Sequence, residues 1–234
     1  MQIPARFRRS LQNLRDVRKY VGNNRTIRQF IQNYDMVYFG IVDPKDEVQL
    51  VRGITMSTTK TDKHYCVGTA YGRDMIFVQR RDSFSAFGRS EREVYHWNIL
   101  AIDLDDSIHL PHTFVEAKKR YGVGFRAAAA MRERDWVELP PHFIGEYSDK
   151  FRKTYAVHMP NSYAASFWGI LAPVTADQMV HYFDMFDYEL ADDTLYVYYL
   201  AKNPSVEKLD HMVKAGVWLA GEVEKTFMAS VSVV

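Results

Sequence analysis

The stretch from Asp62 to Arg81 is the feature that most constrains what this chain can fold into. It contains two runs rich in β-branched and aromatic residues, 64–70 and 74–80, which are joined at 71–73. Such runs favour strands, and Gly72 can adopt the positive φ that a tight hairpin turn requires. Because an isolated hairpin is at best marginally stable in water, we expect other strands to flank it and another element to cover one of its faces.

Neighbouring segments provide the flanking strands. Apolar runs that favour strands occur at 36–42, 47–55, 94–104 and 110–115. Strand candidates at such short intervals indicate an antiparallel meander. The second half is mixed: 152–159 favours a strand, a capping-box pattern at 175–178 predicts a helix, and 188–201 reads as a second hairpin.

A long helix is predicted at the C-terminal end, from Asn203-Pro204 to about Ala229, with Asn as N-cap and Pro at the first helical position. Its apolar residues recur every three or four positions, the spacing of a packed seam. The seam residues are Val206, Leu209, Val213, Gly216, Ala220, Val223 and Phe227. We expect at least half of this seam to be buried within the same chain, with a homodimer as the alternative.

The combined pattern predicts an α+β fold. It consists of an antiparallel β-meander followed by a helix–hairpin half, with amphipathic helices at both chain ends. Pro140-Pro141 marks the best boundary, which divides the chain into segments 1–33, 34–139 and 142–234. With 234 residues, we expect these segments to form one compact unit.

Positive charge is concentrated in residues 1–33. This segment holds eight basic residues and one acidic residue, a net charge of +7, although the whole chain carries only +1. Apolar residues recur at helical spacing over 3–21, with basic residues opposite, which is typical of an amphipathic helix. The basic residues that we expect to meet a membrane or partner are Arg6, Arg8, Arg9, Arg15, Arg18 and Lys19.

Several interpretations of this basic segment stay open. Its apolar face can pack on the core, or it can lie on an anionic membrane surface. Binding to nucleic-acid phosphates is the less favoured alternative. An Arg-rich and acid-poor start is also typical of a cleavable targeting peptide.

A group of acids and histidines follows the strand predicted at 94–104, and carboxylate and imidazole groups are the ligands that divalent metals use. The candidate metal ligands are Asp103, Asp105, His109 and His112, and Asp106 lies among them. The alternative is a polar turn at a strand end, where Asp is common for conformational reasons. No recognised metal motif such as HExxH is present in the sequence.

Cys66 is the single cysteine, so an internal disulfide is excluded and a reducing compartment such as the cytoplasm is expected. Its position in the middle of a predicted strand indicates a buried thiol rather than a nucleophile. The sequence contains no phosphate-binding P-loop, dinucleotide fingerprint or GxSxG elbow.

Two sets of segments resemble known families. The first set resembles a family of unknown function from host-associated bacteria with small genomes; it consists of Asp62-Lys-His-Tyr-Cys-Val-Gly-Thr69, Gly72-Arg-Asp74, Trp97-Asn-Ile-Leu100 and Pro111-His-Thr-Phe114. The second set is similar to the second half of a wider bacterial domain of unknown function; it consists of Phe151-Arg-Lys-Thr-Tyr-Ala-Val157, Leu171-Ala-Pro-Val-Thr-Ala-Asp-Gln-Met179 and Asp193-Thr-Leu-Tyr-Val-Tyr198. The resemblance covers about residues 36–201 and implies no catalytic residue. The wider domain often follows transmembrane helices, whereas an Arg-rich segment stands in that place here.

We therefore predict a non-enzymatic interaction protein that needs no cofactor. It would be soluble in the cytoplasm or bound peripherally to a membrane through the basic N-terminal helix. Its partner would be an unknown protein or an anionic membrane surface. The alternative is a metal-dependent hydrolase that uses Asp103, Asp105, His109 and His112.

Overall fold

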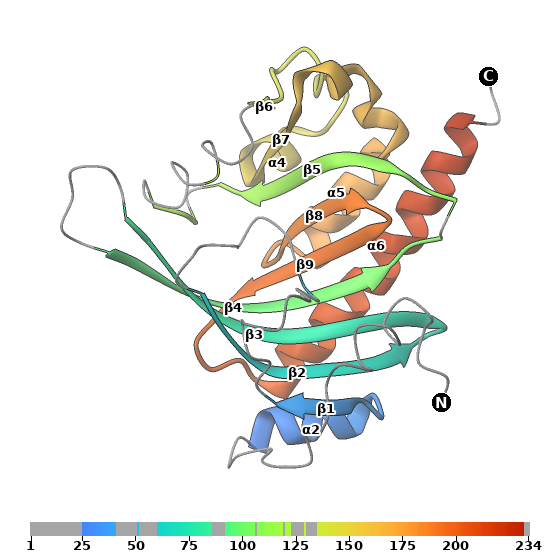
Figure 1. The fold of residues 1–234 in the computed structure, drawn as a ribbon. Coiled ribbons are helices and arrows are strands. Elements are labelled where there is room, and N and C mark those ends of the chain that lie inside the picture. The colour runs from blue at the N-terminus through green and yellow to red at the C-terminus, as the bar shows by residue number, and fades with distance from the viewer. Residues whose placement is uncertain are drawn as a thin grey trace.

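One nine-stranded antiparallel sheet forms the centre of the described structure, and helices accompany it (Figure 1). The computed structural model describes residues 25–40, 51, 60–85, 92–105, 107–118, 120–122, 129 and 135–231. The strands occur in the order β1-β2-β3-β4-β9-β8-β5-β7-β6. The protein is thus a mixed α and β structure, as predicted. The strand expected at 47–55 and the helix expected at 3–21 lie outside the described residues, apart from Val51, which is buried and not in a strand.

The first four strands are neighbours in chain order: β1 (Val37–Gly40), β2 (Thr61–Ala70), β3 (Arg73–Ser85) and β4 (Arg92–Asp103). β2 and β3 form the hairpin that the sequence predicted. Its turn contains Tyr71 and Gly72, whose φ angles are 52° and 80°. A two-residue turn with positive φ at both central positions has a backbone twist that matches the right-handed twist of the strands it joins.

The strand that follows β4 in the chain does not pair with it. β5 (Leu110–Ala117) lies between β8 (Asp187–Asp192) and β7 (Tyr155–Pro160), while β9 (Thr194–Leu200) pairs with β4. The short strand β6 (Trp136–Glu138) pairs with β7 at the end of the sheet. The β8–β9 hairpin is thus inserted between β4 and β5. Strands from both sides of Pro140-Pro141 share one sheet.

The helices are α2 (Arg25–Asn33), α4 (Asp149–Thr154), the 3₁₀ helix η1 (Asn161–Gly169), α5 (Pro173–Tyr182) and α6 (Val206–Val231). α5 begins earlier than the capping-box pattern predicted, because Pro173 occupies its first turn and Ala172 is the N-cap. A strand was expected at 152–159, but its first three residues belong to α4 and the strand β7 begins only at Tyr155. Ser148 caps α4 by accepting a hydrogen bond from the Phe151 N–H at 3.2 Å. None of these helices combines the length and the apolar character that a membrane span requires.

α6 crosses one face of the sheet and packs against β4 and β9 (Figure 1). A Cβ atom on Gly216 would lie 2.5 Å from Ile102 Cδ1 and 3.0 Å from Val197 Cγ2, so the helix backbone approaches these strands closely. The predicted burial of the seam within the chain is confirmed. The buried seam residues are Leu209, Val213, Gly216, Ala220 and Val223.

Both faces of the central strands are buried. Phe77 lies on the face that α6 and α2 cover, where its ring contacts Phe30 edge to face with centroids 5.0 Å apart. Ile76 and Val78 alternate with it and belong to a second apolar cluster on the opposite face. Val67, Ile76, Phe77 and Val78 are all buried. Burial on both faces explains why 75–78 is a continuous apolar run rather than an alternating one.

Candidate functional site

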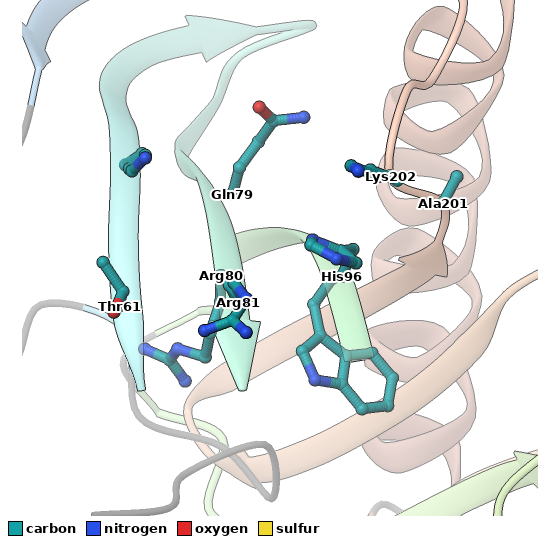
Figure 2. Close-up of a pocket in the computed structure, with 9 residues that line it drawn as sticks. Thr61, Gln79, Arg80, Arg81, His96, Ala201 and Lys202 are labelled. Atoms are coloured by element: carbon teal, nitrogen blue, oxygen red, sulfur yellow. The ribbon is translucent and has the colours of Figure 1, made fainter. Parts of the chain in front are cut away.

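A cavity of about 300 Å³ lies over β2, β3, β4 and the segment that follows β9 (Figure 2). It is on the α6 side of the sheet, because Gln79 and Arg81 follow Phe77 by two and four positions along β3 and therefore lie on the same face as Phe77. Its lining residues are Thr61, Lys63, Gln79, Arg80, Arg81, His96, Trp97, Ala201 and Lys202. We call this site the cationic pocket.

Basic side chains dominate the cationic pocket. Lys63 comes from β2, Arg81 from β3, His96 from β4 and Lys202 from the segment after β9. No Asp or Glu is among the nine lining residues. Within the part of the chain that the structure describes, no carboxylate forms an ion pair with Lys63, Arg81 or Lys202. Positive charges that gather without an acidic partner attract anions from solution.

A bulge in β2 turns Lys63 toward the cavity. Lys63 pairs with Gln79 while Cys66 pairs with Phe77, so three steps along β2 match two steps along β3. His64 lies within this extra length and has a φ of 57°. Because side chains alternate between faces, one inserted residue moves every residue before it to the other face. Lys63 therefore faces the cavity instead of the opposite side of the sheet.

The buried side chain of Asn98 holds the segment that carries Lys202. Its Nδ2 donates to the carbonyl oxygens of Tyr199 and Ala201 at 3.0 and 2.9 Å. The Ala201 N–H donates to the His96 carbonyl oxygen at 3.0 Å. Asn98 also accepts a 2.7 Å hydrogen bond from Gln79 Nε2. The backbone before Lys202 is thus fixed to β4, which places this lysine beside the other cations.

The pKa of His96 reflects the positive charge of the pocket. Partial burial lowers the pKa of His96, and the nearby charges of Lys202 and Arg81 lower it further. An unbalanced positive field therefore acts on the imidazole. A bound anion would oppose that field and favour the protonated ring.

Arg80 differs from the other cations around the cavity because its charge is already balanced. Its Nε and Nη2 donate to the two carboxylate oxygens of Asp62, each at 2.7 Å, and Nη2 also donates to the Val51 carbonyl oxygen at 2.9 Å. These partners hold the guanidinium in a fixed position. Arg80 therefore supports the fold beside the pocket.

Each of the predicted metal ligands has a different structural role, and they do not form one site. Asp105 accepts hydrogen bonds from the Ser107 N–H and hydroxyl at 2.9 and 2.6 Å, which lowers the pKa of Asp105 and closes a turn. His109 is exposed, Asp103 ends β4 opposite Thr194, and Asp106 lies outside the described residues. No group of three His, Cys, Asp or Glu side chains within the described ranges is arranged to hold a metal ion.

His112 instead belongs to a buried network on the face opposite the cationic pocket. Its imidazole is hydrogen-bonded to Glu189, which also accepts from the Tyr198 hydroxyl. On the neighbouring strands, His158 Nε2 lies 3.0 Å from Glu116 Oε2. The sequence did not predict these pairs, since the partners are 77 and 42 residues apart.

The basic residues of the N-terminal segment, Arg6, Arg8, Arg9, Arg15, Arg18 and Lys19, lie outside the described residues. The described part of this segment is α2, which buries Ile27 and Phe30 and exposes Arg25 and Arg28. The residues of the cationic pocket were not predicted from the sequence. A signal was present as polar residues two positions apart in otherwise apolar strands, namely Thr61 and Lys63, Gln79 and Arg81, and His96 and Asn98.

Comparison with known proteins finds similarity at the level of the fold. No family model matches the chain, and no curated protein matches it. One solved structure is similar, the crystal structure of the mycobacterial trehalose monomycolate transport factor A, TtfA. The two share 10% sequence identity with a TM-score of 0.56, over 88% of this chain and 95% of that one. The chain thus shares the overall fold of the TtfA structure.

Proposed function

We propose that this chain is a non-enzymatic interaction protein that holds an anionic group of its partner in the cationic pocket. The observation that carries the proposal is the approach of Lys63, Arg81 and Lys202 to one cavity that, among the residues the structure describes, no Asp or Glu lines. Such an arrangement attracts and positions negative charge. The fold shared with a structure described as a transport factor supports a role in interaction.

The partner in this proposal is a protein with an acidic surface or an anionic membrane. The net charge of +7 in residues 1–33 would add to the attraction, with Arg6, Arg8, Arg9, Arg15, Arg18 and Lys19 contributing. In the membrane case the amphipathic helix predicted over 3–21 would lie in the interface, so attachment would be peripheral. The cytoplasm remains the proposed location.

The test is binding of the full-length protein to anionic lipid vesicles and to a poly-glutamate peptide, measured at two salt concentrations. Arg81→Glu combined with Lys202→Glu should weaken binding at least about tenfold, because the variant reverses two charges in the pocket. Lys150→Glu combined with Lys214→Glu is the matched control, since both lysines are exposed and lie outside the pocket. Equal weakening by both variants, or no binding by the wild type, would refute the proposal.

A further inference from the structure

We propose that the cationic pocket binds a phosphate monoester, either a small organic phosphate or the headgroup of a lipid. This inference rests on the proposed function, because it names the anion that the same pocket takes. It follows from the charge, arrangement and size of the cavity.

The charge of the pocket matches a ligand with two negative charges better than one with a single charge. Lys63, Arg81 and Lys202 carry permanent positive charges, and His96 adds a fourth when it is protonated. A phosphate monoester carries about 1.5 to 2 negative charges at neutral pH. A lone carboxylate would leave most of the positive charge unbalanced.

The arrangement of the donors suits a tetrahedral group. The basic side chains come from three neighbouring strands, β2, β3 and β4, and from the segment after β9, so four separate segments of the chain place donors at the cavity (Figure 2). A guanidinium such as that of Arg81 can donate to two oxygens of a phosphate at once, and a lysine acts as a point charge. Thr61 adds a hydroxyl donor on the same lining. A planar carboxylate has too few oxygens for donors from four segments.

The size of the pocket indicates an ester rather than a free phosphate ion. A volume of about 300 Å³ equals that of roughly ten water molecules in the liquid. A phosphate group has only five heavy atoms, so space is left for a small attached group. Glycerol phosphate is the simplest ligand of this class, and phosphatidic acid presents the same phosphate monoester on a membrane.

Binding should also take up a proton at His96. The charged groups that face its imidazole are Arg81 on β3 and Lys202 after β9, with Lys63 one strand further away. A bound dianion would offset these positive charges, which favours the imidazolium. Affinity should therefore rise as the pH falls from 8 to 7, a range in which the phosphate stays mostly doubly charged because its second pKa is about 6.

The soluble arm of the test is calorimetric titration of the full-length protein with glycerol phosphate and with malonate, which carries two carboxylates and so matches the charge. We expect glycerol phosphate to bind at least about tenfold more tightly than malonate. Arg81→Gln combined with Lys202→Gln should lose at least about tenfold in affinity, while Lys150→Gln combined with Lys214→Gln should keep it. Titrations at pH 7.5 in two buffers of different ionisation enthalpy should show proton uptake that His96→Asn abolishes.

The lipid arm compares vesicles containing phosphatidic acid with vesicles containing phosphatidylglycerol, a diester, at equal surface charge. If the wild type prefers phosphatidic acid and the pocket variant does not, the inference is supported and the phosphate belongs to a lipid. If only glycerol phosphate binds through the pocket, the inference is supported and the ligand is a soluble organic phosphate. Equal affinity for malonate would overturn the phosphate assignment and leave the proposed function standing, and binding without proton uptake would overturn the protonation of His96. Failure of every anion, vesicle and acidic peptide to bind through the pocket would overturn both.

Discussion

The Arg80 guanidinium donates two hydrogen bonds of 2.7 Å to the Asp62 carboxylate across the β2–β3 hairpin. Their side chains are 0% and 10% exposed, so the pair is almost fully buried. Lys63 is adjacent to Asp62 in the sequence but lies on the opposite face of the sheet, in the cationic pocket. One short segment of β2 therefore anchors the fold on one face and lines the candidate site on the other.

Removing the charge of Asp62 should destabilise the protein strongly. Asp62→Asn removes the carboxylate that accepts two hydrogen bonds from the buried Arg80, which should lower the free energy of unfolding by about 3–5 kcal/mol. Urea denaturation measures this change. Asp149→Asn is the control, because Asp149 forms an exposed ion pair with Arg152 and should matter far less. If Asp62→Asn proves as mild as the control, Arg80 does not depend on this carboxylate.

Two glycines of α6 should respond to alanine in opposite ways. Gly216→Ala places a Cβ 2.5 Å from Ile102 Cδ1, and overpacking of this kind costs about 1–3 kcal/mol. Gly221→Ala meets nothing closer than Arg73 Nη2 at 3.9 Å, so the better helix propensity of alanine should stabilise the protein by up to about 1 kcal/mol. Thermal unfolding of both variants checks this. A stabilising Gly216→Ala would mean that α6 does not approach β4 so closely.

Cys66 should be chemically inert in the folded protein. Its side chain is buried, its thiol donates to the His64 carbonyl oxygen at 3.1 Å, and burial raises the pKa of the thiol well above its usual range. A thiol reagent at pH 7.5 should label native protein at least about 100-fold more slowly than an exposed cysteine. Lys150→Cys in a Cys66→Ala background provides that comparison, because Lys150 is exposed. Rapid labelling of native Cys66 would contradict the buried position.

Asp187 should make stability fall as the pH rises between about 4 and 6. Burial raises the pKa of Asp187 to about 6, although Arg120, Tyr121 and the Ala117 N–H all favour its ionised form. Since the unfolded pKa is near 3.9, the native state binds the proton more tightly over this window. The stabilisation is fully present below about pH 4 and is lost as the pH rises through 6.

The measurement is the free energy of unfolding of the wild type minus that of Asp187→Asn, followed from pH 3.5 to 7. This difference should fall by roughly 3 kcal/mol, which corresponds to a shift of about two pKa units. Other titrating groups cancel in the comparison, since both proteins contain them. A difference that stays constant, or rises with pH, would show that Arg120 keeps Asp187 ionised throughout.

Local structure was largely readable from the sequence. The hairpin of β2 and β3 followed from its β-branched and aromatic residues and the turn at Gly72, and α6 followed from its helical seam and the Asn203-Pro204 start. These signals act between residues a few positions apart, where backbone geometry and side-chain alternation determine which conformations are accessible. The burial of Cys66 followed from its position in the middle of a predicted strand.

The tertiary structure alone decided which strands became neighbours and which side chains formed a site. A strand with alternating burial can pair with any other such strand, so periodicity did not reveal that β8 and β9 separate β4 from β5. The direction of Lys63 depends on one extra residue in β2, which is defined only against its partner strand. Lys63 and Lys202 are distant in the chain, yet both line the cationic pocket. They come together because burial of the apolar strands brings their segments to one sheet.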